Sequence, residues 1–155
     1  MSIELHGYSD ASSYAYVALV YLRVELESSM KSVLVASKTR VAPLSGQTIP
    51  RLELLVAVIL GRLVKHVVGV LSGTLRIGRR CWVDSTAVLY WIIDEKKQWK
   101  QFMQNQILEI ISLVGPSCWS YFPTSVNPAY LASRGMKASD LAVRGVERCH
   151  VPFAS

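Results

Sequence analysis

The sequence predicts an α/β domain in which a single mixed β-sheet has helices on both faces, and two observations support this prediction. Three segments rich in Val, Tyr and Leu follow one another with short polar links, as in an antiparallel meander. After residue 42 the apolar residues recur at helical spacing, and further helical segments alternate with two short strands. The order β-β-β-α-β-α-α-β-α favours a five-stranded sheet with three antiparallel strands followed by parallel ones.

The meander occupies the first quarter of the chain. Its first strand is expected over Leu5–Tyr8 and leads directly to Asp10. A second strand is expected over Tyr14–Val24 and a third over Ser32–Thr39, joined by the polar turn Glu25–Met30.

A long helix follows the loop Ala42–Gln47. Thr48 is suited to cap it, and Pro50 is suited to its first turn. Its apolar residues lie at helical spacing and are Leu52, Leu55, Val56, Ile59, Leu60, Leu63, Val64 and Val67. A broad apolar face of this kind indicates a helix that packs on the sheet.

The second half of the chain alternates between strands and helices. A short strand is expected over Arg80–Asp84, with a helix that begins near Ser85. An amphipathic helix over Gln98–Leu113 and a fifth strand over Ser117–Phe122 follow, and Ser139 is suited to cap a final helix.

The composition indicates one domain over residues 1–155 in a reducing compartment. The length fits a single domain. The three cysteines are far apart and form no CxxC pair, which favours buried thiols over a zinc site or a disulfide framework. The N-terminus lacks a basic region followed by an apolar run, so secretion is not expected.

The stretch Leu54–Leu71 is the most apolar part of the chain. It contains Arg62, Lys65 and His66. Each cation at the centre of a bilayer would cost roughly 2.5–3.5 kcal/mol on the insertion scale. A buried helix is therefore expected, and no membrane is expected as a partner.

Positive charge is concentrated in the middle of the chain. The segment Lys31–Lys100 contains 12 of the 17 Lys and Arg residues and 4 of the 11 acidic residues. This distribution suggests a polyanionic partner, although a basic surface without a partner would have the same composition.

Three acids stand where active sites of α/β proteins form. Asp10 and Asp84 end predicted strands, and Glu53 is in the first turn of the long helix. Carboxylates that converge in a protein interior need a compensating cation, which would be a hard metal such as Mg²⁺. The alternative for each residue alone is a turn for Asp10, a helix-dipole interaction for Glu53 and a helix cap for Asp84.

Four groups of residues, in order, resemble the ribonuclease H domain of BEL/Pao-type retrotransposon polyproteins, a region also named as a Pao retrotransposon peptidase family. The resemblance runs from about residue 5 to residue 135. It is carried by Leu5–Ser12, by Ser37–Leu44 together with Ile49–Leu54, by Trp82–Leu89 and by Asn127–Gly135.

This resemblance implies a ribonuclease H-like fold and hydrolysis of the RNA strand of RNA–DNA hybrids. It further implies two Mg²⁺ ions, or Mn²⁺ in their place, held by Asp10, Glu53 and Asp84. The parent polyprotein would also contain reverse transcriptase and integrase. The expected location is then the cytoplasm, in a virus-like particle of the element, or the nucleus.

Tyr130 departs from the pattern of the resembling family. The family has a metal-binding Asp at this position, whereas a phenol with a pKa near 10 is a poor Mg²⁺ ligand at neutral pH. Impaired cleavage is therefore expected, unless Asp140 replaces the missing ligand.

Further polar residues are candidates for contacts with nucleic acid, because they adjoin the acids or form a basic cluster with Trp99. They are Ser12, Arg51, Ser85, Lys96, Lys97, Lys100 and Arg134. The alternative for the cluster is a solvated helix start with Trp99 packed in the core.

Three functions compete at this stage. The first is a metal-dependent ribonuclease H, and the second is a non-catalytic nucleic-acid-binding or scaffold domain with the same fold. The third is an aspartic peptidase. Its motif requires Asp-Thr/Ser-Gly, whereas Asp84-Ser85-Thr86 lacks the glycine and leads into an apolar helical segment.

Overall fold

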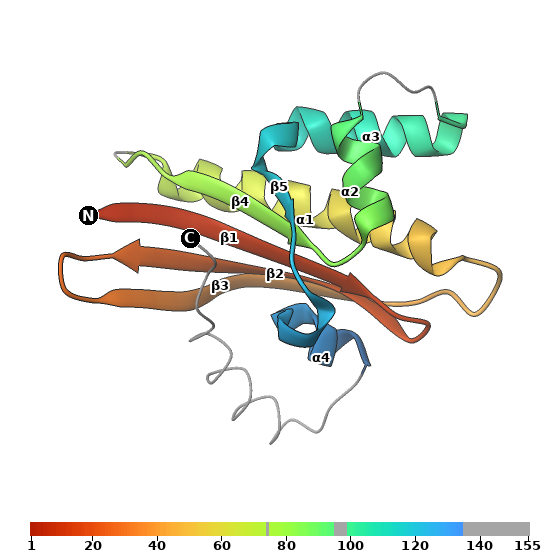
Figure 1. The fold of residues 1–155 in the computed structure, drawn as a ribbon, viewed down its shortest axis with the longest axis horizontal. Coiled ribbons are helices and arrows are strands. Elements are labelled where there is room, and N and C mark those ends of the chain that lie inside the picture. The colour runs from red at the N-terminus through yellow and green to blue at the C-terminus, as the bar shows by residue number, and fades with distance from the viewer. Residues whose placement is uncertain (74, 95–98, 135–155) are drawn as a thin grey trace.

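A five-stranded sheet forms the centre of the protein (Figure 1). The structure is a computed structural model that describes residues 1–73, 75–94 and 99–134. The strands are β1 (Ser2–Ala11), β2 (Ala15–Glu25), β3 (Met30–Val41), β4 (Gly78–Val83) and β5 (Trp119–Tyr121). They lie in the order β3-β2-β1-β4-β5. The first three strands are antiparallel, β4 is parallel to β1 and β5 is parallel to β4, which confirms the predicted mixed sheet.

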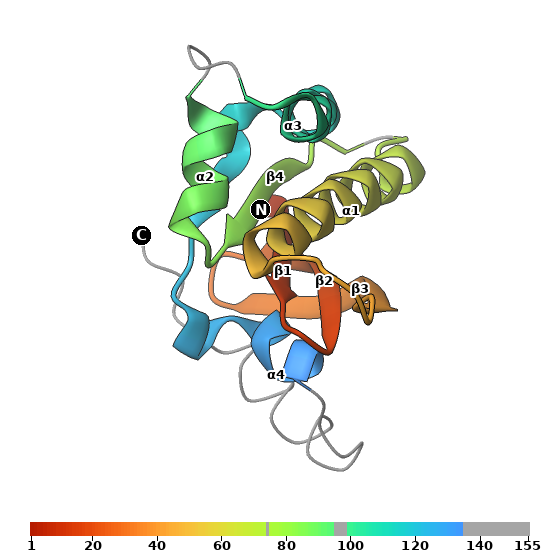
Figure 2. The same ribbon diagram turned by 90° about the vertical axis from the view of Figure 1, so that its right-hand side faces the viewer.

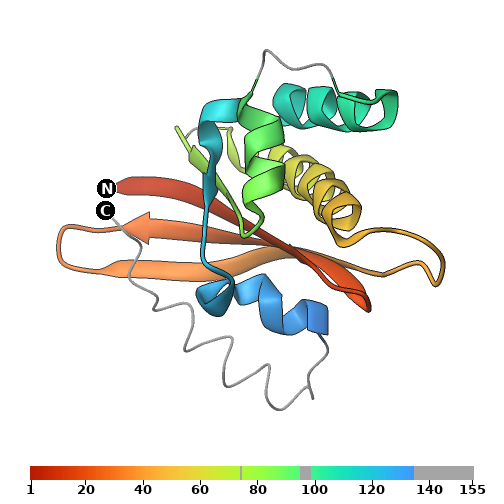
Figure 3. The same cartoon turned by 45° about the vertical axis from the view of Figure 1, so that its right-hand side comes forward.

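Helices cover both faces of this sheet. They are α1 (Ile49–Leu71), α2 (Thr86–Ile93), α3 (Gln101–Leu113) and α4 (Pro128–Arg134). Figure 2 shows α1 on one face and α4 on the opposite face. Figure 3 shows α2 and α3 on the same side as α1, with the chain passing from β5 to the other side to form α4.

The main core lies between α1 and the sheet. Leu52, Leu60 and Val64 of α1 are buried there, as the helical spacing predicts. Close approach of α1 to β1 depends on Gly7, because a Cβ at this position would lie 2.7 Å from Cδ1 of the buried Leu60. The helix α1 is long and apolar enough to cross a membrane, but the core helices of globular domains often have the same length and composition. In this structure the buried side of α1 packs on the sheet.

A second, smaller core lies on the α4 face and is rich in aromatic residues. Tyr8 packs edge-on against both Tyr21 and Phe122. Ala129 of α4 is fully buried against this cluster. These contacts fix α4 next to the end of β1, where Asp10 lies.

Several elements differ from the sequence predictions in extent. The first and third strands begin earlier and end later than predicted, because pairing with β2 extends them beyond their apolar residues, whereas β2 is shifted by one residue from its predicted range. Thr48 stands at the N-cap position of α1, but its side chain makes no capping hydrogen bond. The predicted cap of a final helix at Ser139 lies outside the described residues.

The helix α4 was not predicted, although the sequence contains a signal for it. Asn127 precedes the first helical residue, Pro128, and its Oδ1 accepts a hydrogen bond from the Ala129 N–H at 3.0 Å. An Asn followed by Pro suits the start of a helix, because Asn can accept from the free N–H groups and Pro has no N–H to satisfy.

Of the two described cysteines, Cys81 agrees with the predicted buried thiols and Cys118 agrees only in part. Cys81 in β4 is fully buried, Cys118 is half-buried, and both are free. Cys149 lies outside the described residues.

Candidate active site

Asp10 and Asp84 meet because β1 and β4 are parallel neighbours. The pairing of Ser9 with Val83 makes Asp10 and Asp84 the next residues along the two strands. The carboxyl ends of parallel strands lie at the same edge of a sheet, where α/β proteins place their sites. Asp10 is 2% exposed, whereas Asp84 is half-buried.

Glu53 approaches the same edge from α1. Its carboxylate, Asp10 and Asp84 line one narrow pocket, here called the acidic pocket. The other lining residues are Ser9, Val56, Val83, Ser85 and Val88. The structure therefore brings together the three acids that the sequence analysis singled out from three separate segments.

The crowding of like charges alters the acid strength of two of these groups. Burial raises the pKa of Asp84 to about 7, and the negative charge of Asp10, a hydrogen bond to Asp10 and the charge of Glu53 act in the same direction. Burial likewise raises the pKa of Glu53, against a hydrogen bond from Ser85 that lowers it. Such shifts are typical of functional sites, because function requires polar groups where water cannot compensate them.

Asp10 differs from the other two acids because it has a cationic partner. Nη1 of Arg134 lies 2.7 Å from Oδ2 of Asp10. The Ser133 hydroxyl donates a hydrogen bond to the same oxygen. Both partners come from the end of α4, so this helix supplies the charge that balances the buried Asp10 carboxylate.

Tyr130 lies beneath this ion pair. The guanidinium carbon of Arg134 is 3.9 Å from the centre of the Tyr130 ring, which is a cation–π contact. Tyr130 is half-buried and is not among the residues that line the acidic pocket. The aromatic ring thus supports the arginine that pairs with Asp10.

Two polar residues to which the sequence analysis assigned no role of their own hold α4 in place. Nδ2 of Asn127 donates to the Ser9 carbonyl oxygen at 3.0 Å, next to Asp10. Ser133 is fully buried, and its carbonyl oxygen accepts a 2.6 Å hydrogen bond from the Ser12 hydroxyl. The Asn-Pro pair could have indicated Asn127, but no local signal marks the contacts of Ser133 with Ser12 and Asp10, which are over 100 residues away in the sequence.

The predicted nucleic-acid contacts are spread over different environments. Ser12 and Ser85 are buried, and their hydroxyls serve the turn after β1 and the N-cap of α2. Arg51 is exposed and its guanidinium lies 4.3 Å from the centre of the Phe102 ring. Lys100 is exposed immediately before α3.

The remaining residues of this group belong to the basic cluster around Trp99. Lys96 and Lys97 lie outside the described residues. Trp99 packs edge-on against Tyr90 and Trp91, which agrees with the alternative of a packed aromatic residue. Among the predicted contacts, Arg134 and Ser85 lie beside acids of the pocket: Arg134 pairs with Asp10, and Ser85 lines the pocket and hydrogen-bonds to Glu53.

The acidic pocket suits a hard cation by its donor chemistry. Carboxylates are the oxygen ligands that Mg²⁺ prefers. The raised pKa of Asp84 results from burial and from repulsion by Asp10 and Glu53, and a bound cation would offset both. Within residues 1–73, 75–94 and 99–134, however, no three acidic, His or Cys side chains are already arranged to bind an ion. The donor set fits a metal, and its side chains would have to rearrange around one.

Comparison with solved structures supports the ribonuclease H fold. The N-terminal ribonuclease H domain of a Mycobacterium tuberculosis protein, solved as a fusion with maltose-binding protein, has a TM-score of 0.56 at 14% identity. The similarity covers 94% of this chain and 99% of that one. For RNase H1 of Halobacterium salinarum the TM-score is 0.50 at 11% identity, over 83% of this chain and 91% of that one.

Sequence comparison identifies the family. No curated protein sequence matches the chain. A model of the Pao retrotransposon-like RNaseH-like domain matches residues 1–85, more than half of the sequence, including Asp10, Glu53 and Asp84. The motif at Asn127–Gly135 lies beyond the matched residues. The match confirms the resemblance on which the sequence analysis relied, and the chain belongs to the family of Pao retrotransposon-like RNaseH-like domains.

Proposed function

We propose that this domain hydrolyses the RNA strand of RNA–DNA hybrids with divalent metal ions bound at the acidic pocket. The observation that carries the proposal is the convergence of Asp10, Glu53 and Asp84, from β1, α1 and the end of β4, on one pocket. Membership of an RNaseH-like family and a ribonuclease H fold support the reaction class.

Asp10, Glu53 and Asp84 would hold the metal ions. Mg²⁺ is the first candidate and Mn²⁺ the second, since both favour carboxylate oxygens. Bound there, such ions supply an activated water and stabilise the leaving oxygen. The protein contributes the orientation of its carboxylates through a hydrogen bond from Ser85 to Glu53 and one from Thr124 to Asp84.

Two features of the site argue for slow cleavage. Tyr130 provides a phenol where the family resemblance places a fourth carboxylate. In addition, Arg134 already pairs with Asp10, so a metal ion has to compete with a fixed guanidinium for this carboxylate. Both effects weaken metal binding without disturbing the fold.

The second candidate function is a nucleic-acid-binding domain without turnover. The Arg134–Asp10 ion pair favours it specifically, because it balances the buried charge without a metal ion. Under this alternative the fold is retained and hybrids bind, but Mg²⁺ does not promote cleavage.

Cleavage of a labelled hybrid separates the two candidates. The purified chain would be incubated with an end-labelled RNA–DNA hybrid in Mg²⁺, in Mn²⁺ and in EDTA, next to single-stranded RNA as a substrate control. The nuclease predicts metal-dependent cleavage of the hybrid alone, which Glu53→Gln abolishes. Binding without any metal-dependent cleavage would assign the non-catalytic function.

The aspartic peptidase hypothesis gains no support. Ser85 and Thr86 cap and begin α2 directly after Asp84, whereas the peptidase motif needs a glycine-containing loop. Reverse transcriptase and integrase as parts of a parent polyprotein, a cytoplasmic or nuclear location and the absence of a membrane partner remain predictions from the resemblance and the composition.

A further inference from the structure

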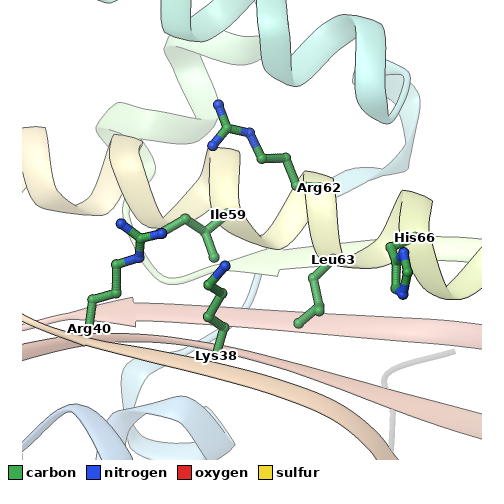
Figure 4. A pocket seen from close by; sticks show the side chains of 6 residues that line it. All are labelled: Lys38, Arg40, Ile59, Arg62, Leu63 and His66. Carbon is green, nitrogen blue, oxygen red and sulfur yellow. The ribbon is translucent and has the colours of Figure 1, made fainter.

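A second polar site lies between β3 and α1, away from the acids. It is a cleft of about 280 Å³, here called the basic cleft, and its lining residues are Lys38, Arg40, Ile59, Arg62, Leu63 and His66. Figure 4 shows Lys38 and Arg40 rising from the strand toward the helix, with Ile59 and Leu63 between them and the helix axis. Arg62 extends away from the strand.

The positive charge of this cleft is largely uncompensated. None of the described residues that line the basic cleft is acidic. Arg62 pairs with Glu109 of α3 at 2.6 Å, but no ion pair joins Lys38 or Arg40 to any acid in the described part of the chain. Like charges that converge without a counter-charge create a field that attracts an anion.

The local sequence explains how the cations reach one place. Lys38 and Arg40 are two residues apart on an exposed edge strand and therefore point to the same face, toward α1. Arg62 and His66 are four residues apart and share a face of α1. Charges on an exposed edge strand also discourage edge-to-edge pairing with another chain. That role does not explain why a cation of α1 lines the same cleft.

The cleft continues toward the acids. A neighbouring cleft of about 200 Å³ shares Arg40, Ile59 and Arg62 with the basic cleft, and it adds Tyr16, Leu55, Val58 and Gln106. Leu55 is only two residues beyond Glu53. With a rise of about 1.5 Å per residue, the distance from Glu53 to His66 along α1 is about 20 Å. A single extended ligand can therefore reach from the basic cleft to the acidic pocket.

We infer that the basic cleft binds the phosphate backbone of a nucleic-acid strand. The inference rests on the proposed function for the choice of nucleic acid among polyanions, and it adds a binding site that contains none of the acids. Lys38 and Arg40 are about 7 Å apart along the strand, which is comparable to the distance between successive phosphates. The apolar floor formed by Ile59 and Leu63 suits the sugar faces between them.

Binding of a fluorescein-labelled RNA–DNA hybrid, followed by anisotropy in EDTA, tests the inference without cleavage. The double variant Lys38→Gln/Arg40→Gln removes two charges but keeps side-chain stems that cover Ile59 and Leu63. The matched control is Arg76→Gln/Arg79→Gln, which removes two exposed charges elsewhere. Thermal melting monitors the folding of both variants.

The cleft variant should bind roughly tenfold more weakly at moderate salt, and its slope of log K against log salt should be about 1.8 smaller in magnitude. The control should change affinity less than about twofold. Equal losses in the two variants, or no loss in the cleft variant, would overturn the site. So would tighter binding of a polyglutamate peptide that depends on the same two residues, because the cleft would then suit an acidic protein.

The outcome is separable from that of the proposed function. A chain that binds hybrid through Lys38 and Arg40 but never cleaves it retains the basic cleft and loses the nuclease. A chain that cleaves hybrid and tolerates the cleft variant without loss of affinity retains the nuclease and loses the cleft. A chain that binds no nucleic acid refutes both.

Discussion

The acidic pocket and the basic cleft lie along the same helix, but the charged groups are largely buried in the pocket and exposed to solvent in the cleft. At the first turn of α1, Glu53 joins two aspartates in a narrow pocket where Asp10 is 2% exposed. Further along, Lys38, Arg40 and Arg62 line an open cleft and are exposed to solvent. One region confines like charges inside the protein, and the other leaves them in water.

The difference shows what each region needs from a ligand. In the acidic pocket, desolvation of the carboxylates raises the pKa values of Asp84 and Glu53. The third acid, Asp10, forms an ion pair with Arg134. The protonation and pairing of the three acids therefore depend on neighbouring groups of the protein. In the basic cleft, water screens the repulsion at little cost, and the charge remains available for an external anion.

The substitution Tyr130→Asp should have the largest effect on activity, because it adds a fourth carboxylate next to the acidic pocket. A fourth carboxylate would compete for Arg134 and add a metal ligand beside Asp10. Cleavage of a labelled hybrid in Mg²⁺ should rise about 10²–10³-fold, or about 3–4 kcal/mol in the barrier. Tyr130→Phe serves as the control. Equal rates for the native chain and Tyr130→Asp would mean that residue 130 does not occupy the fourth ligand position.

Arg134→Gln should break the internal compensation of Asp10. Without the guanidinium, a buried carboxylate loses its counter-charge, and the free energy of unfolding in EDTA should fall by about 1–3 kcal/mol. Urea denaturation measures this change, and calorimetric titration should show tighter Mg²⁺ binding. Arg51→Gln, another exposed arginine over an aromatic ring, should alter neither quantity by a comparable amount. Unchanged metal affinity in Arg134→Gln would show that the ion pair does not compete with the metal.

The pH dependence of stability tests the crowding of the acids. Folded Asp84 binds its proton up to about pH 7, whereas the unfolded chain releases it near the ordinary value of 3.8. Between these values the folded state binds more protons, so the free energy of unfolding in EDTA should decrease as pH rises. For this half-buried group we expect on the order of 1–2 kcal/mol after solvent screening.

Asp84→Asn should remove most of that dependence. The slope that remains combines two opposite contributions, because burial raises the pKa of Glu53 and lowers that of His6. Urea denaturation at pH 5 and pH 8 provides the comparison. The difference between the two chains is the test, because burial lowers the pKa of His6, and this makes both chains more stable as pH rises. A difference in unfolding free energy that is the same at pH 5 and pH 8 would contradict the raised pKa of Asp84.

The substitution Arg62→Gln should have the smallest effect on the free energy of unfolding, because Arg62 lies in the solvent-exposed basic cleft. It breaks the 2.6 Å ion pair with Glu109, but the Arg62 side chain is 59% exposed and that of Glu109 is 34% exposed. Exposed pairs contribute about 0–1 kcal/mol, so the free energy of unfolding should change by less than about 0.5 kcal/mol. A loss as large as that of Arg134→Gln would mean that the cleft is less accessible to water than its exposure indicates.

The sequence by itself determined the order of the elements and the identity of the three acids. Alternating and helical apolar patterns are local signals, so the meander and α1 could be placed from residues near each other in the chain. The motifs around Asp10, Glu53 and Asp84 were recognisable for the same reason, because each motif is contiguous. The helix α4 was within reach of the same reasoning through the Asn127-Pro128 pair, but was missed.

Only the tertiary structure decided how the charges are balanced. The pairing of Asp10 with Arg134 joins residues 124 positions apart, and the basic cleft combines cations of β3 with those of α1. Neither follows from spacing along the chain, because the pKa of a carboxylate and the openness of a cleft depend on desolvation and on neighbours that the fold brings together. The sequence specifies which ionisable side chains are present, whereas the folded arrangement determines how their charges are balanced.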